Sequence, residues 1–187
     1  MPSAAAAAIA AVTFVALYAG HQIGDHVVQS NGTAVAKGFP GPEQLAAGVS
    51  PWTGWGACLR HVGTYTGTQA VALALVSLVA PVGLTGCAVA LVVSASTHAV
   101  IDRRWIVRRL VRAKGCQDWA EGPYLIDQSL HVGAMLVAAV LAVAVTGVVG
   151  LLAVTAGALV LMVAALAVER RLAAASVRAA APVGGRR

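Results

Sequence analysis

Five long apolar stretches, separated by glycines, prolines and arginines, dominate the pattern of hydrophobic and polar positions along the chain. A transmembrane α-helix needs about 20 mostly apolar residues to cross a hydrocarbon core of about 30 Å. Residues 4–28, 57–79, 84–101, 124–148 and 151–168 meet that requirement. The pattern therefore predicts an all-α fold, a polytopic membrane helix bundle of about five transmembrane helices. No basic residue precedes the first stretch, so we expect it to be a retained helix rather than a signal peptide.

The connection between the third and fourth stretches predicts a different kind of helix. In residues 103–114, basic and apolar residues alternate in blocks at helical spacing, which is typical of an amphipathic segment lying in the membrane surface. We expect its arginines to contact anionic lipid headgroups, namely Arg103, Arg104, Arg108, Arg109 and Arg112. Trp52, Trp55 and Trp105 are interpreted as interfacial anchors.

The distribution of basic residues predicts the orientation. Six lysines and arginines lie between the third and fourth stretches, and five arginines follow the fifth. Because basic residues collect on the cytoplasmic side, the N-terminus is expected outside and the C-terminus in the cytoplasm of a multi-pass protein of the inner (plasma) membrane. Residues 1–168 form a single transmembrane helical domain in this interpretation, and residues 169–187 form an Arg/Ala-rich cytoplasmic tail that is expected to be disordered.

The amino-acid composition limits the classes of function that the chain can have. Hydrophobic residues make up 59% of the 187 residues and charged residues only 11%, against about 25% charged in a soluble domain. The net charge of +6 is concentrated near the predicted membrane surface, so the expected partners are the lipid bilayer and its anionic headgroups rather than nucleic acid. Three dispersed cysteines without a CxxC pair suggest neither a thiolate zinc site nor a disulfide framework. The oligomeric state stays open.

Ionisable residues recur at helical spacing within four of the apolar stretches. His21, Asp25 and Gln29 follow one another at intervals of four and therefore share one stripe of a helix. The third stretch ends with His98 and Asp102, the fourth begins with Asp127 and His131 in reversed order, and His61 lies near the start of the second. In the predicted topology all of these positions fall at the cytoplasmic leaflet. A charge at membrane depth costs about 3 kcal/mol unless it is paired, so such residues usually serve a function.

The residue types favour a divalent-metal site. Imidazole and carboxylate ligands suit Zn, Fe or Mn, and seven side chains are available: His21, Asp25, His61, His98, Asp102, Asp127 and His131. Asp25, Asp102 and Asp127 are the candidate catalytic carboxylates, since a metal-activated water with a carboxylate base performs hydrolysis. The leading hypothesis is a metal-dependent membrane hydrolase with a lipid-linked or phosphorylated substrate.

Other interpretations of the same residues stay open. His/Asp chains also serve proton or metal transport, although a relay should extend through both leaflets. The pairs can also be plain hydrogen bonds that fix helix packing in a non-catalytic membrane scaffold. His26, about 100° around the helix from Asp25, is interpreted as an interface residue, and Gln29 and Gln128 as hydrogen-bond partners.

The order of the four polar motifs, His21-x-x-x-Asp25-x-x-x-Gln29, His61, His98-x-x-x-Asp102 and Asp127-Gln128-x-x-His131, resembles that of a bacterial integral-membrane family, domain of unknown function 3307. The resemblance covers residues 16–137 and implies a small polytopic bacterial membrane protein. A looser similarity links the helix-end motifs to membrane-bound metal-dependent hydrolases. This chain lacks the His-Arg pair that usually begins the motifs of those hydrolases.

Overall fold

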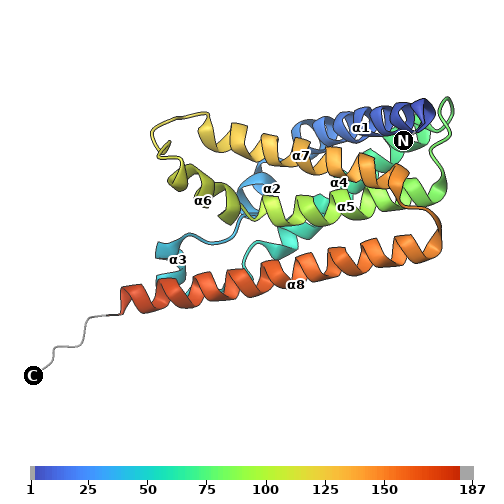
Figure 1. Ribbon diagram of the computed structural model, residues 1–187. Helices are drawn as coiled ribbons and strands as arrows, with labels where there is room; N and C mark the ends of the chain where they lie inside the picture. Colours follow the sequence, from blue (N-terminus) through green and yellow to red (C-terminus); the bar gives the residue numbers. More distant parts are fainter. Residues whose placement is uncertain (1–2, 182–187) are drawn as a thin grey trace, which may run out of the picture.

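The computed structural model describes residues 3–181, and every regular element within that range is helical (Figure 1). The long helices are α1 (Ala4–Ile23), α4 (Trp55–Val76), α5 (Leu84–Asp102), α7 (Gly122–Ala144) and α8 (Gly147–Ala180). A π-helical turn, η1 (Gly24–Val28), extends α1. Three short helices lie in the connections: α2 (Asn31–Ala36), α3 (Pro42–Ala46) and α6 (Trp105–Ala113). The predicted all-α fold is therefore confirmed.

Four helices of the described chain are long and apolar enough to cross a membrane. They are α1 together with its π-helical turn, α5, α7 and α8. The remaining long helix, α4, has 22 residues but carries Arg60, His61 and Gln69 together with several threonines, which lower its hydropathy. The structure thus supports a membrane helix bundle with four candidate spans, while the fifth remains a prediction.

Helices α1, α4, α5 and α7 form the bundle, and α8 packs along the outside of α5 (Figure 1). Two glycines allow close backbone approach. A Cβ at Gly20 of α1 would lie 2.6 Å from the Cα of Gln69 in α4, and a Cβ at Gly86 of α5 would lie 2.7 Å from the carbonyl oxygen of Ala142 in α7. Small residues at such contacts are typical of helix pairs in membranes, because the packing itself holds the helices together.

The bundle interior changes character along its length. One half is filled by an apolar core whose buried members come from all four helices: Ala16, Leu17, Leu73, Ala90, Met135, Ala138, Ala139 and Ala142. The other half, next to α2 and α6, contains the histidines and aspartates. The buried histidines and the aspartates beside them therefore lie at one end of the described bundle, while Thr13 and Gln69 are buried elsewhere in it.

Helix α6 differs from the predicted membrane-surface segment in what its apolar face contacts. Val107 and Val111 are buried against Ile126, Leu130 and Ala134 of α7. The amphipathic pattern was correct, but the apolar face packs against protein. The pattern alone does not distinguish these two surroundings, since both bury the same side chains.

The Arg/Ala-rich tail also differs from expectation. Helix α8 continues through residue 180, so residues 169–180 are helical rather than disordered; the rest of the predicted tail, residues 182–187, lies outside the described residues. Glu169 and Ala173 are buried, the latter against Phe39 and Leu45. These contacts stabilise the helix beyond the apolar stretch.

Candidate metal centre

Four helices bring buried histidines and aspartates together at one end of the bundle. The end of α1 and its π-helical turn, the start of α4, the end of α5 and the start of α7 meet there, because neighbouring helices alternate in direction. Each imidazole of this cluster is at most 2% exposed. All seven side chains that the sequence indicated as ligands lie in the cluster: His21, Asp25, His61, His98, Asp102, Asp127 and His131.

Four of these side chains, which we call the inner group, are His61, His98, Asp25 and Asp102, and the carboxylates of both aspartates lie against the two imidazoles. The Nε2 atoms of His61 and His98 lie 3.0 Å apart. Asp25 Oδ1 lies 3.1 Å from His61 Nε2 and 3.5 Å from His98 Nε2. Asp102 Oδ2 lies 3.1 Å from His98 Nε2 and 3.5 Å from His61 Nε2. Each carboxylate therefore approaches both imidazoles.

The inner group has the spacing and chemistry of a cation site. Ligand atoms at about 2.0 Å from a tetrahedral zinc ion are separated by about 3.3 Å, close to the 3.0–3.5 Å measured here. Asp102 Oδ2 is buried and has no hydrogen-bond partner among the described residues. Its ion-pair partners are the imidazole nitrogens of His98 and His61 at 3.1 and 3.5 Å, and a cation held between them would compensate its charge. Two imidazoles with two carboxylates suit Zn, Fe or Mn, so the residues fit a divalent ion.

A second set, which we call the outer group, lies beside the first and shares Asp102 with it. The ligand atoms of Asp102, Asp127 and His131 all lie within 4.8 Å of one another. His131 Nε2 is 3.6 Å from Asp127 Oδ2 and 3.7 Å from Asp102 Oδ1, and it too has no hydrogen-bond partner in the described part of the chain. The Asp127 side chain is 23% exposed, whereas that of Asp102 is 1% exposed. The outer group therefore faces the more open side of the cluster.

His21 occupies the flank of the cluster. Its Nε2 lies 3.1 Å from Gln128 Oε1 and donates a hydrogen bond to it, which leaves Nδ1 facing Asp25 Oδ2 at 3.7 Å. The imidazole ring is 5.1 Å from that of His131 between centroids. With Nε2 engaged by an amide oxygen and Nδ1 without a hydrogen-bond partner among the described residues, His21 lies beside the inner group and does not complete it.

The π-helical turn explains how Asp25 reaches His61. A Cβ on Gly24 would lie 2.9 Å from Thr68 Oγ1 and 3.2 Å from the Cα of Tyr65, so only glycine permits this approach of α1 to α4. Single π-helical turns are frequent at functional sites, where they displace side chains from the regular helical stripe. Here the turn contains Asp25 itself.

Lys37 is a member of the cluster that the sequence did not indicate. It follows α2 directly, is 5% exposed, and places its Nζ 2.7 Å from Asp102 Oδ1. The ammonium also donates to Gln29 Oε1 at 3.4 Å. A buried lysine is rarely found without a paired carboxylate. Lys37 and Asp102 are 65 residues apart along the chain, so no local sequence pattern could indicate that they pair.

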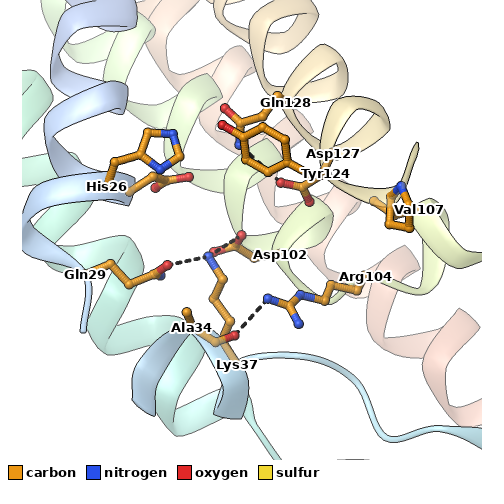
Figure 2. A pocket seen from close by; sticks show the side chains of 12 residues that line it. His26, Gln29, Ala34, Lys37, Asp102, Arg104, Val107, Tyr124, Asp127 and Gln128 are labelled. Carbon is orange, nitrogen blue, oxygen red and sulfur yellow. Dashed lines mark hydrogen bonds and ion pairs between the residues drawn. The ribbon is translucent and has the colours of Figure 1, made fainter. Parts of the chain in front are cut away.

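A cavity of about 420 Å³ adjoins the cluster (Figure 2). Asp25, Asp102 and Asp127 line it together with Lys37 and Arg104. Arg104 has a φ of 63°, a left-handed conformation that is strained for a side chain other than glycine or asparagine, and its Nη2 donates to the carbonyl oxygen of Ala34 at 2.8 Å. The cavity is large enough for a small polar molecule and presents both carboxylates and cations to it.

Next to the cluster, Arg103 has a different role from the predicted headgroup contact. It is fully buried, and its Nε donates to Glu169 Oε1 at 2.7 Å. Its guanidinium also donates to the carbonyl oxygens of Lys37, Pro51 and Thr53. The prediction for Arg103 was wrong because its guanidinium is buried and pairs with the buried carboxylate of Glu169 rather than reaching lipid.

Trp55 also differs from the predicted interfacial anchor. It is 8% exposed, its Nε1 donates to Glu169 Oε2 at 2.9 Å, and the Arg103 guanidinium lies 4.7 Å from its ring centroid. Arg103, Glu169 and Trp55 thus form a buried node that ties α8 to α5 and to the connection before α4. The only acidic residue in the last apolar helix, Glu169, was the signal in the sequence that could have revealed it.

The remaining arginines of the basic segment stay at the surface. Arg104, Arg109 and Arg112 are exposed, and Arg108 is half-buried with its Nη2 donating to the carbonyl oxygen of Phe39. Burial, followed by the neighbouring charges of Arg104 and Arg112, lowers the pKa of Arg108. The positive charges of these neighbouring arginines repel one another and make this surface attractive to anions.

Comparison of the chain with protein-family models, with curated proteins and with solved structures found no match. Membership of the family of domain of unknown function 3307 therefore stays a prediction.

Proposed function

We propose that this chain is a multi-pass protein of the bacterial plasma membrane that binds a divalent metal ion in its inner group and hydrolyses an anionic substrate at the cytoplasmic leaflet. The observation that carries the proposal is the convergence of His61, His98, Asp25 and Asp102 beside a cavity lined by further charged residues. Zn, Fe and Mn are the candidate ions. When bound, such an ion supplies Lewis-acid activation of water and of a substrate oxygen.

Three charged residues around the inner group have further roles in the proposed hydrolysis. Asp127 lines the cavity with a partly exposed carboxylate and is the candidate general base, held next to His131. Lys37 and Arg104 place two cations on the same cavity wall (Figure 2). Because a guanidinium and an ammonium both bind phosphate oxygens, a phosphorylated or lipid-linked phosphate substrate fits this wall best.

Hydrolysis of phosphate mono- and diesters in mixed micelles tests the reaction class. We expect metal-dependent release of product that stops on chelation and returns with the ion. Asp127→Asn is expected to lower kcat by about 100-fold to 10,000-fold with metal content unchanged, because the loss of a general base slows proton transfer only. Asp118→Asn, an exposed acid outside the cluster, is the matched control. Full activity in Asp127→Asn would contradict the assigned role, and metal-loaded protein inert towards phosphate and carboxylic esters alike would contradict hydrolysis.

A proton or metal relay is the second candidate, favoured by a polar chain that leaves the cluster towards the bundle centre. Tyr65 stacks on His98 at 3.7 Å, its hydroxyl lies 2.8 Å from Ser94 Oγ, and Gln69 Nε2 donates to it at 2.7 Å. Beyond Gln69 the apolar core fills the bundle. Since a relay has to reach the other leaflet, the closed core favours hydrolysis. Proton or metal flux in proteoliposomes would instead favour a relay over hydrolysis.

We propose five crossings, with α4 as the fifth spanning helix, the N-terminus outside and the C-terminus cytoplasmic. In this orientation the exposed arginines of α6 face anionic headgroups. Reporter fusions test it: alkaline phosphatase is expected to be inactive when joined after residue 180 and active when inserted at Thr146, in the turn before α8, with a fluorescent protein giving the opposite pattern. The reverse result at both positions would overturn the orientation.

A further inference from the structure

The inner and outer groups offer two adjacent cation positions that share Asp102, and Lys37 approaches the second of them. Asp102 directs Oδ2 towards the imidazoles of the inner group. Its other oxygen, Oδ1, lies 2.7 Å from Lys37 Nζ and 3.7 Å from His131 Nε2. The ammonium and the outer group thus meet at the same carboxylate oxygen, as Figure 2 shows for Lys37 and Asp102.

The charges of the cluster, of which Asp102 is buried and Asp25 and Asp127 are partly buried, distinguish one bound ion from two. The carboxylates of Asp25, Asp102 and Asp127 contribute three negative charges, and the Lys37 ammonium contributes one positive charge. One divalent ion therefore neutralises the cluster when the imidazoles are neutral. Arg104, on the cavity wall, is exposed and its charge is screened by water, while Arg103 and Glu169 compensate each other. A second divalent ion would leave two uncompensated positive charges in a buried site, which is strongly unfavourable.

The short distance between Lys37 Nζ and Asp102 Oδ1 also argues against a second metal ion. An ion bonded to Asp102 Oδ1 at about 2.1 Å would lie within about 5 Å of the ammonium that contacts the same oxygen. Like charges at this separation repel strongly where water is excluded. A lysine in this place therefore substitutes for the second metal ion.

We propose that Lys37 is a built-in cation that holds the outer position and limits this cluster to one divalent metal ion. The inference rests on the proposed metal site and adds its stoichiometry. It also leaves Asp127, which lines the cavity, available to a substrate rather than to a second ion.

Metal stoichiometry after equilibration with ZnCl₂ and removal of free zinc tests the inference on purified full-length protein. The wild-type chain is expected to bind one equivalent and Lys37→Met two, since the variant removes the charge and keeps the length of the side chain. Lys37→Arg retains the charge and is expected to bind one. Lys114→Met, the other lysine of the chain and exposed, is the matched control and is also expected to bind one.

The outcomes separate this inference from the proposed function. One equivalent in folded Lys37→Met, or two in the wild type, would overturn the inference while leaving a metal protein. No zinc in the wild type would overturn the proposed function itself. If Lys37→Met fails to fold, Asp127→Asn decides: one retained equivalent supports an empty outer position, whereas loss of the ion makes Asp127 a ligand of the resident metal and contradicts the inference.

Discussion

Asp102→Asn is expected to weaken metal binding by more than about 100-fold, the largest effect of any single substitution in the cluster. Among the described residues, Asp102 alone forms ion pairs both with the imidazoles of the inner group and with the Lys37 ammonium. The amide removes the negative charge and leaves the ammonium without its carboxylate in a buried site, while the shape of the side chain is kept. Competition of the purified variant with a chromophoric chelator measures the affinity.

The control for this substitution is Asp118→Asn, which changes the same functional group at an exposed position. We expect wild-type affinity there. A monodisperse Asp102→Asn protein with wild-type affinity would show that Asp102 is not a ligand. Loss of a monodisperse peak, with metal still bound to the folded fraction, would assign to Asp102 a packing role.

Glu169→Gln is expected to lower the free energy of unfolding by about 3–5 kcal/mol, because it leaves the fully buried Arg103 guanidinium without a counter-charge. The amide can still accept the hydrogen bond of the Trp55 indole, so the charge is the main loss. Denaturant titration in micelles measures the change. Glu121→Gln, exposed before α7, is expected to change stability by less than about 0.5 kcal/mol.

The double variant Arg103→Met, Glu169→Leu gives the decisive comparison for the buried node. It removes both charges and replaces them by apolar side chains, so we expect it to be more stable than Glu169→Gln. If the double variant were as unstable as the sum of its two single changes, the pair would not be coupled, and the node would be a set of independent packing contacts.

The positions of the His/Asp cluster could be predicted from the sequence because they follow from local rules. The pair His98 and Asp102, and the reversed pair Asp127 and His131, lie four residues apart and so share a helix face. The alternation of helix direction then brings the ends carrying these pairs together. Neither step needs knowledge of how the connections fold.

Lys37 and the Arg103–Glu169 pair could not be predicted in the same way. Lys37 lies in a connection rich in glycine and proline, whose path depends on the carbonyl oxygens that Arg103 binds. Contacts between segments that lie far apart in the chain leave no periodic pattern of polar and apolar residues in the sequence. The basic pattern of residues 103–114 likewise predicted a helix but not the burial of Arg103. A positive charge can pair equally with a lipid phosphate or with a buried carboxylate, so the pattern does not distinguish the two.

Elemental analysis of the whole 187-residue chain, purified in mild detergent without a histidine tag or chelator, tests whether the inner group holds one divalent metal ion. We expect about one equivalent of zinc, iron or manganese in the wild type and background metal in His98→Ala, whose imidazole faces both carboxylates of the inner group. Background metal in the wild type, or an equal metal content in both proteins, would contradict a metal site in the inner group.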